Sequence, residues 1–136
     1  MTINFNERFK AVLAEKNTNI NQLRLKMDLG MGHLSMVAKR GNLTSETIIS
    51  IAHHLDVTVG HLLYGDDTLT NNGSGDLKTD MNRLANAAGV TIYRVCKDLG
   101  MSSAAMYNLL RKNNAKLQTM ERFANYFNVP VTEFIK

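Results

Sequence analysis

Apolar residues recur along the chain at the three- and four-residue spacing of amphipathic helices. One stripe follows the i, i+4, i+7 and i+8 positions of a helical face and consists of Phe5, Phe9, Val12 and Leu13. A second stripe with helical spacing consists of Leu77, Met81, Leu84 and Ala88. Between and after these stripes, apolar clusters alternate with capping residues and glycines. The pattern predicts an all-α protein with five short helices in each half.

The predicted helices after each first stripe begin at polar caps and end at turns. Asn21 and Thr91 are expected to cap second helices that end at Leu29-Gly30 and Leu99-Gly100. Ser102, or Gly32 in the first half, then precedes a third helix. The expected third, fourth and fifth helices cover about 33–39, 46–55 and 59–63 in the first half, and 103–111, 118–127 and 131–135 in the second. Five methionines and the cysteine fall at core spacing: Met27, Met31, Met36, Met101, Met106 and Cys96.

The two halves repeat each other. Residues 51–57 (IAHHLDV) return 72 positions later as residues 123–129 (FANYFNV). The middle of each half, from Leu29-Gly30-Met31 to Met36, aligns instead with residues 70 positions later. We therefore expect two extra residues near 17–19 in the first half and two near 113–116 in the second. Both differences are expected in loops, because an insertion within a helix would rotate every later side chain.

The stretch 65–76 contains three glycines and three aspartates but a single large apolar residue. Such a composition cannot bury a face and predicts a flexible linker. The predicted organisation is thus a first domain at 1–65, a linker at 66–76 and a second domain at 77–136. Each domain is small, and no residues remain for a third.

Composition narrows the class of protein further. No apolar run approaches the length of a membrane span, and the N-terminus lacks the pattern of a secretion signal, so no membrane partner is expected. The single Cys96 cannot form an internal disulfide, which fits a reducing compartment such as bacterial cytoplasm. Residues 77–136 hold nine Lys/Arg against four Asp/Glu, within a formal net charge of +4. This balance suits a polyanion such as DNA but does not prove it.

The spacing of several residues resembles the phage-repressor and Cro-type helix-turn-helix family, also called Xre-like. In the second half the matching residues are Val90-Thr91, Val95-Cys96, Leu99-Gly100-Met101-Ser102, Met106 and Phe123-Ala124. In the first half they are Ile20-Asn21, Leu25, Leu29-Gly30-Met31, Met36 and Ile51-Ala52, with a loop after the third helix that is two residues shorter. The resemblance implies two tandem lambda-repressor-like domains of five helices each.

If the resemblance extends to mechanism, the third helix enters the major groove and the start of the second helix meets phosphate. In the second domain this implies base contacts by Ser103, Ala104 and Asn108, since Asn can pair bidentately with adenine. Backbone contacts would come from Thr91, Tyr107, Arg111, Lys112 and Lys116, although Tyr107 is equally suited to a core or interface. In the first domain, His33, Leu34 and Ala38 would face bases, and backbone contacts would come from Asn21, Gln22, Ser35, Lys39 and Arg40.

Residue patterns for catalysis or cofactor binding are not found. His53 and His54 point about 100° apart on a helix, and the other histidines lack metal-ligand spacing. The sequence contains no phosphate-binding glycine loop, cysteine pair or paired acids. We expect a protein that is not an enzyme and that binds no metal and no cofactor.

Two functions fit these features. The first is a sequence-specific regulator of transcription, in the manner of a phage or mobile-element repressor, that binds double-stranded DNA in the bacterial nucleoid. One chain would bind two half-sites, or a homodimer would bind a palindrome. The second is a protein-interaction module, such as an antirepressor or an inhibitor, in which a helix-turn-helix unit docks a protein partner. Steep salt dependence would distinguish DNA binding from an apolar protein interface.

Overall fold

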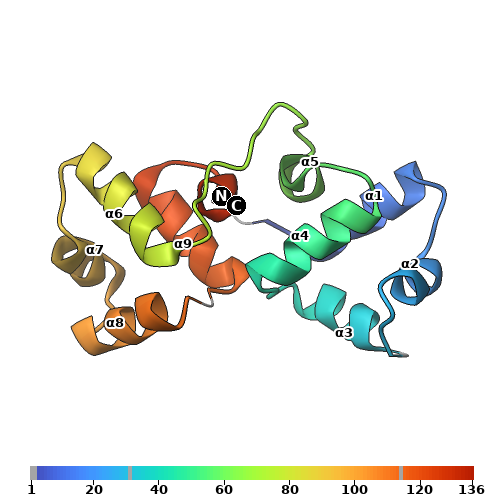
Figure 1. Ribbon diagram of the computed structural model, residues 1–136, viewed down its shortest axis with the longest axis horizontal. Coiled ribbons are helices and arrows are strands. Elements are labelled where there is room, and N and C mark those ends of the chain that lie inside the picture. The colour runs from blue at the N-terminus through green and yellow to red at the C-terminus, as the bar shows by residue number, and fades with distance from the viewer. Residues whose placement is uncertain (1–2, 31, 114) are drawn as a thin grey trace. The chain divides into compact units, whose positions relative to one another are not determined.

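The computed structural model describes residues 3–30, 32–113 and 115–136, and these form helices without any β-strand (Figure 1). They fall into two compact units, Met1–Thr70 and Asn71–Lys136. Each unit has its own buried core, so each is described by itself. Among the described residues no helix is long and apolar enough to cross a membrane.

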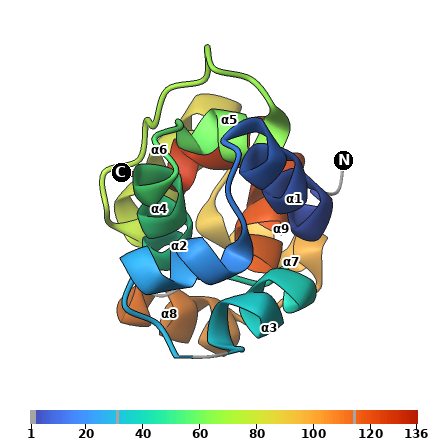
Figure 2. The same ribbon diagram turned by 90° about the vertical axis from the view of Figure 1, so that its right-hand side faces the viewer.

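The described part of the first unit contains five helices, which are labelled in Figure 2. They are α1 (Phe5–Glu15), α2 (Ile20–Lys26), α3 (His33–Arg40), α4 (Ser45–His54) and α5 (Val59–Tyr64). Helix α1 packs against α3 and α5, and α4 packs against α5. Phe5 and Phe9 stack on each other with ring centroids 5.5 Å apart, and both are buried. The apolar face predicted from their spacing is therefore the face that α1 turns to the core.

The second unit contains four α-helices and a 3₁₀-helix in the same order. They are α6 (Leu77–Ala88), α7 (Ile92–Leu99), α8 (Ser103–Lys112), α9 (Leu117–Phe127) and η1 (Val131–Phe134). Helix α6 contacts each of the other four elements, and α9 also packs on η1. The fifth element is a 3₁₀-helix of four residues, shorter than the predicted helix at 131–135, and Pro130 precedes it. Pro fits there because its missing N–H and fixed φ do not disturb a helix start.

The residues with left-handed backbone show that the repeat has one constant offset. Four pairs of left-handed residues stand 72 positions apart and end equivalent segments: Asn17 and Gly89, Asp28 and Gly100, Gly41 and Asn113, and Asp56 and Asn128. The middle of the unit obeys the same offset as its ends, so the predicted offset of 70 and the paired loop insertions are wrong. The offset of 70 came from matching Leu29-Gly30-Met31 with Leu99-Gly100-Met101. In the structure, however, Asp28 and not Gly30 takes the left-handed position that Gly100 takes in the second unit.

The corrected offset changes which residues of the third helix of the first unit are core. Leu34 and Ala38 are each only 1% exposed, whereas Met36 is 54% exposed. Leu34 therefore corresponds to the buried Met106, and the predicted core role of Met36 is wrong. Burial confirms Met106 and Cys96 as core residues. Met27 and Met101 are half-buried, and Met31 lies outside the described residues.

Helix caps agree with the sequence in the second unit and for α3 in the first, whereas the cap of α2 is two residues earlier than predicted. Thr91 and Ser102 cap α7 and α8, and each hydroxyl oxygen accepts a backbone N–H at 3.1 Å. Asn19, not Asn21, caps α2, since its Oδ1 accepts the N–H of Gln22 at 2.9 Å. Gly32 is the N-cap of α3, with a left-handed φ of 82° and no side-chain cap.

Part of the predicted linker packs on the first unit. The N–H and the hydroxyl of Thr68 both donate to the Asp66 carboxylate, which lowers the pKa of Asp66. Leu69 lies so close to Gly60 that a Cβ added there would be 2.6 Å from the Leu69 Cβ. The absence of a side chain at Gly60 therefore permits residues 66–69 to cover α5.

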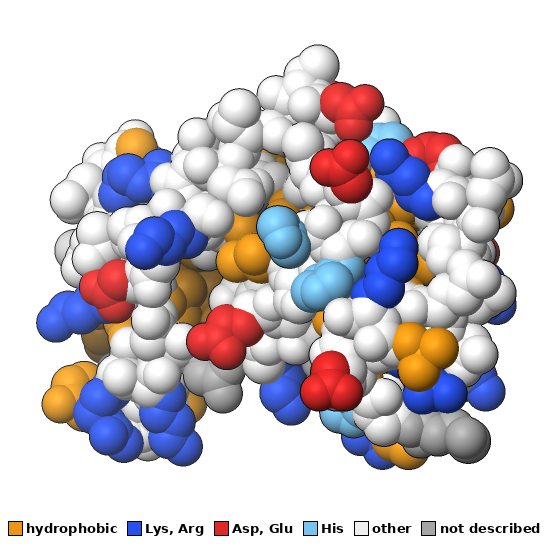
Figure 3. Space-filling model, turned by 45° about the vertical axis from the view of Figure 1, so that its right-hand side comes forward, with side chains coloured by type: hydrophobic (Ala, Val, Ile, Leu, Met, Phe, Trp, Pro, Cys, Tyr) orange, Lys and Arg blue, Asp and Glu red, His pale blue; other side chains and the backbone are white. Residues whose placement is uncertain are grey.

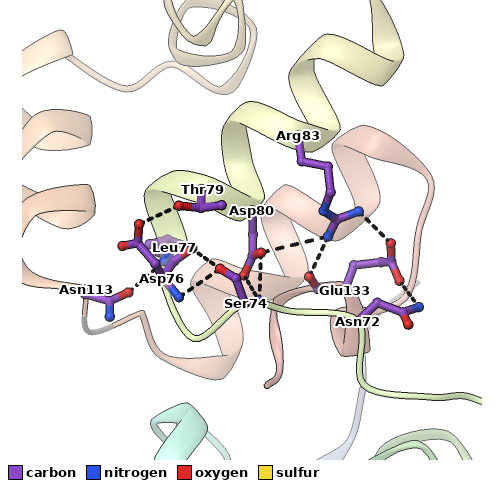
Figure 4. Close-up of polar contacts among 9 residues, drawn as sticks. All are labelled: Asn72, Ser74, Asp76, Leu77, Thr79, Asp80, Arg83, Asn113 and Glu133. Atoms are coloured by element: carbon purple, nitrogen blue, oxygen red, sulfur yellow. Dashed lines mark hydrogen bonds and ion pairs between the residues drawn. The ribbon is translucent and has the colours of Figure 1, made fainter.

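The other part of the predicted linker is bound to the second unit (Figure 4). The N–H groups of Asn72 and Gly73 donate to the carbonyls of Thr132 and Ile135 at 3.0 and 2.8 Å. The Ser74 N–H donates at 2.9 Å to a carboxylate oxygen of Asp80, a side chain that is buried. Segment 66–76 thus differs from the flexible linker that its composition predicts, because its ends are hydrogen-bonded to different units.

Three further contacts hold α6 to the rest of its unit, and those of Asn113 with Leu77 and of Arg83 with Glu133 are drawn in Figure 4. Asn113, which ends α8, accepts the N–H of Leu77 at 2.7 Å and donates to the Gly75 carbonyl at 2.9 Å. On the same helix, Arg83 forms an ion pair with Glu133 at 3.1 Å. The contacts of Asn113 link the end of α8 to the start of α6 and so help to set the surface that α8 exposes, while the ion pair links α6 to η1.

Candidate nucleic-acid interface

Helix α8 exposes two parallel rows of side chains. Ser103, Tyr107 and Arg111 are spaced by four residues and form one row, and the adjacent row consists of Ala104, Asn108 and Lys112. All six are exposed, while Met106 on the opposite side of the helix is 1% exposed and packs into the core. The fold therefore presents every residue that the sequence assigned to α8 on one accessible face.

The C-terminal half of this face is cationic and uncompensated. Arg111 and Lys112 occupy the last turn of α8, and Lys116 is exposed at the start of α9. None of these three side chains forms a hydrogen bond or an ion pair within the described part of the chain. Segment 101–116 contains no acid. Lys and Arg side chains gather over the part of the second unit where α8 lies (Figure 3).

The nearest acid on α7, Asp98, is engaged by other groups. Its carboxylate accepts the Tyr126 hydroxyl at 2.6 Å and the Arg94 Nε at 3.1 Å. The hydrogen bond from Tyr126, followed by that from Arg94, lowers the pKa of Asp98, and the same bond raises the pKa of Tyr126. The charge of Asp98 is thus compensated by the Arg94 cation, and its carboxylate is also hydrogen-bonded by the Tyr126 phenol.

Two exposed aromatic rings belong to this face or lie beside it. Tyr107 on α8 and Tyr93 on α7 are 67% and 69% exposed, which excludes a core role for Tyr107. Both line a shallow, largely apolar cleft of about 250 Å³ between α7 and α8. Sequence reasoning missed Tyr93. Its signal is that Tyr93 falls outside the apolar stripe that α7 buries through Val95 and Cys96.

Thr91 lies at the N-terminus of α7, as expected. Its hydroxyl oxygen accepts the N–H of Arg94, so the hydroxyl proton remains free to donate to an incoming acceptor. The α7 N-terminus also carries the positive end of the helix dipole. This arrangement suits a phosphate oxygen.

In the first unit the structure supports only part of the predicted site. His33, Lys39 and Arg40 are exposed on α3, and Ser35 is half-buried. Leu34 and Ala38 are buried, so the prediction that they face bases is wrong, because the two-residue register error exchanged the inner and outer faces of the helix. The side chain that α3 exposes in their place is Met36, at 54%.

The remaining predicted residues of the first unit lie in the first turn of α2. Asn21 and Gln22 are exposed. The Oδ1 of Asn21 accepts the Arg24 Nε at 2.8 Å, and Gln22 accepts the Thr18 hydroxyl at 2.9 Å. Both side chains therefore have local partners that a ligand would have to displace.

The pair α7 and α8, joined by the turn at residues 100–102, forms a helix-turn-helix arrangement in which the second helix is exposed. Residues 80–136 match the family model of the Cro/C1-type helix-turn-helix DNA-binding domain. This helix-turn-helix domain thus includes α7, α8 and α9. Its match supports a DNA-binding regulator and a DNA partner. Neither the curated proteins nor the solved structures give a match to the chain.

Residue groups that would support other chemistry are few in the described part of the chain. The described residues contain no cluster of three or more His, Cys, Asp or Glu side chains that could hold a metal ion. Burial raises the pKa of the Cys96 thiol, which favours the unreactive protonated form. The exposed face of α8 is therefore the principal candidate site.

Proposed function

We propose that the chain is a sequence-specific DNA-binding regulator that represses transcription by occupying a promoter. The observation that carries this proposal is the exposed face of α8, which combines hydrogen-bonding side chains at one end with unpaired cations at the other. The matched DNA-binding family supports the same conclusion. We place this repressor in the bacterial cytoplasm and nucleoid, in the manner of phage or mobile-element regulators, and assign it no catalytic step and no cofactor.

In this proposal α8 lies in the major groove of DNA. Asn108 can donate to and accept from the major-groove edge of adenine, Ser103 can bond either type of group, and Ala104 can contact a thymine methyl. Arg111, Lys112 and Lys116 would contact phosphates, which fix the register of the helix on the duplex but carry no sequence information. Thr91 would bind a phosphate at the start of α7.

We further propose that the first unit is a second helix-turn-helix domain, with α2 and α3 in the roles of α7 and α8. The shared element order and the constant offset of 72 between left-handed residues support this proposal. A chain with two such domains could bind two half-sites alone, or a homodimer could bind a palindrome through one domain of each chain. Both arrangements are outcomes of the experiment below.

The test begins with selection of duplexes from a random DNA pool by the intact chain at physiological salt. Affinity for the selected duplex is then measured at several salt concentrations for the wild type and for Arg111→Ala with Lys112→Ala. Each lost phosphate contact reduces the slope of log K against log salt by about 0.9, so we expect the double variant to lose about 1.8. A matched control is Lys10→Ala with Lys16→Ala, which removes the same charge from exposed positions of the first unit.

Asn108→Ala should relax preference at one position of the site while leaving the salt slope unchanged. A double variant of Arg111 and Lys112 with unchanged affinity and slope would show that α8 is not the main DNA-binding helix. A folded chain that selects no duplex would refute the regulator and favour the protein-docking module, in which a helix-turn-helix unit binds a protein partner.

A further inference from the structure

Met36 is the least expected side chain on the exposed face of α3. It is 54% exposed, although methionine at this position matches the core pattern of the sequence. His33, Met36 and Arg40 follow the i, i+3 and i+7 positions of one helical face, and all three are exposed. The buried side of the same helix holds Leu34 and Ala38. Met36 therefore lies at the centre of the surface that α3 presents to a partner.

The constant offset of 72 places Met36 at the position that Asn108 occupies in the second unit. Three pairs of residues on or just after the two helices support this assignment. Gly41 and Asn113 both end their helices with a left-handed residue, Leu34 and Met106 are both buried, and Leu43 and Ala115 are both buried. In the proposed function, Asn108 contacts a base edge. The corresponding side chain of the first unit is then an apolar thioether, which has no N–H or O–H to donate.

We infer that Met36 contacts the 5-methyl group of thymine in the half-site bound by the first unit. This inference rests on the proposed function and specifies which chemical group the first unit recognises. The thymine methyl is the largest apolar group that the four bases display in the major groove, so it is the group through which an apolar side chain at a base-reading position discriminates. Methionine suits such a contact because its flexible side chain adapts to the methyl surface.

The charges around Met36 favour DNA over an apolar protein surface. Lys39 and Arg40 follow Met36 on α3 and are exposed, and their side chains make no hydrogen bond or ion pair within the described ranges. Segment 31–45 contains no acid. The exposed thioether thus lies beside uncompensated cations, which complement a polyanion that carries methyl groups.

The experiment removes the methyl groups from the DNA instead of the protein. In the selected duplex, each thymine is replaced singly by deoxyuridine, and the affinity of the intact chain is measured. The burial of one methyl group is worth about 0.8 kcal/mol, so we expect about a fourfold loss at one or two thymines. Those thymines should lie outside the half-site whose preference changes in Asn108→Ala.

The same series is then measured with Met36→Ala, which completes a double-mutant cycle with each uracil substitution. We expect the fourfold effect to disappear at the thymines that contact Met36. The matched control is Leu25→Ala, which truncates another exposed aliphatic side chain of the first unit, from α2, and should retain the wild-type pattern. Circular dichroism checks that both variants are folded.

The outcomes separate this inference from the proposed function. A chain that binds its selected duplex but is insensitive to every thymine methyl overturns the role of Met36 alone. So does a Met36→Ala variant that keeps the wild-type sensitivity to uracil. A folded chain that binds no duplex overturns the proposed function and this inference together. If Met36→Ala and Leu25→Ala instead both weaken capture of a protein and leave DNA binding unchanged, the surface is a protein-docking face and the inference is refuted.

Discussion

Replacement of Leu34 by alanine should destabilise the first unit far more than replacement of Met36. The two side chains lie two residues apart on α3, but Leu34 is 1% exposed and Met36 is 54% exposed. The pattern of the sequence predicts the reverse order, since it places Met36 in the core and Leu34 toward DNA. The pair of variants therefore tests the register of the whole helix.

The expected magnitudes follow from burial. Truncation of a fully buried leucine removes its transfer free energy and leaves a cavity, which together cost about 2–5 kcal/mol. Truncation of the half-exposed Met36 leaves no enclosed cavity, and alanine is the better helix former, so its cost should stay below about 1 kcal/mol. A unit of roughly 70 residues has a total stability of about 3–10 kcal/mol. The Leu34→Ala change should consequently remove a large part of the stability of the first unit.

Because the chain contains two units, a single unfolding transition cannot be assumed. Hydrogen exchange followed by mass spectrometry resolves each unit through its own peptides and avoids this difficulty. We expect Leu34→Ala to accelerate exchange in peptides from α1, α3 and α4 and to leave those from α7 to α9 unchanged. Met36→Ala should exchange like the wild type. Equal acceleration in the two variants, or a larger effect of Met36→Ala, would refute the register described above.

Two other predictions concern the remaining contacts. Gly60→Ala should lower the free energy of unfolding by about 1–3 kcal/mol, because its Cβ would lie 2.6 Å from the Leu69 Cβ. It should also make the amides of residues 66–69 exchange hydrogen faster. Gly30→Ala is the control, since an added Cβ there has no atom within 4 Å. In the wild type, the hydrogen bond from Tyr126 lowers the pKa of Asp98 and raises the pKa of Tyr126. The Tyr126→Phe change removes this bond. The bond stabilises the fold above the unfolded Asp pKa of about 3.9 and below the unfolded Tyr pKa of about 10. The unfolding temperatures of the wild type and Tyr126→Phe should therefore differ most between these two pKa values. The difference should shrink as pH falls through the folded Asp98 pKa or rises through the folded Tyr126 pKa. A difference that does not depend on pH would contradict this account.

The existence and order of the helices could be predicted from the sequence, because helical periodicity and capping act locally. Thr91 and Ser102 cap the helices that they were expected to cap, and the stripe from Phe5 to Leu13 is buried. Register within the first unit could not be predicted, since it depends on which residue ends α2. Asp28 adopts the left-handed conformation with φ 55°, although the neighbouring Gly30 is the residue that usually marks a helix end.

The candidate site, like the fold, could be predicted in the second unit and only partly in the first. On α8 the assigned residues are all exposed, because Met106 fixes the inner face and the outer face follows from helical geometry. On α3 the predicted register was wrong by two residues, so the prediction assigned Leu34 to the exposed face and Met36 to the core. Tyr93 was missed because sequence spacing identifies the residues that a helix buries more readily than those it exposes. Because exposed residues are assigned from the predicted buried face, an error in the register of the core produces the same error in the predicted site.

The two third helices also differ at their start, with a consequence for the DNA that the chain would bind. Helix α8 begins at Ser103, whereas α3 begins at His33, which corresponds to Ala105. The counterpart of Ala104 is the N-cap Gly32, which has no side chain for base contacts, and the counterpart of Ser103 is residue 31, outside the described residues.

Under the proposed function, the described part of α3 contacts bases from His33 and Met36, while α8 does so from Ser103, Ala104 and Asn108. A single chain bound through both units would then prefer two unlike half-sites, whereas a homodimer bound through α8 of each chain would prefer a palindrome. The symmetry of the selected sequence therefore identifies which helices read the DNA.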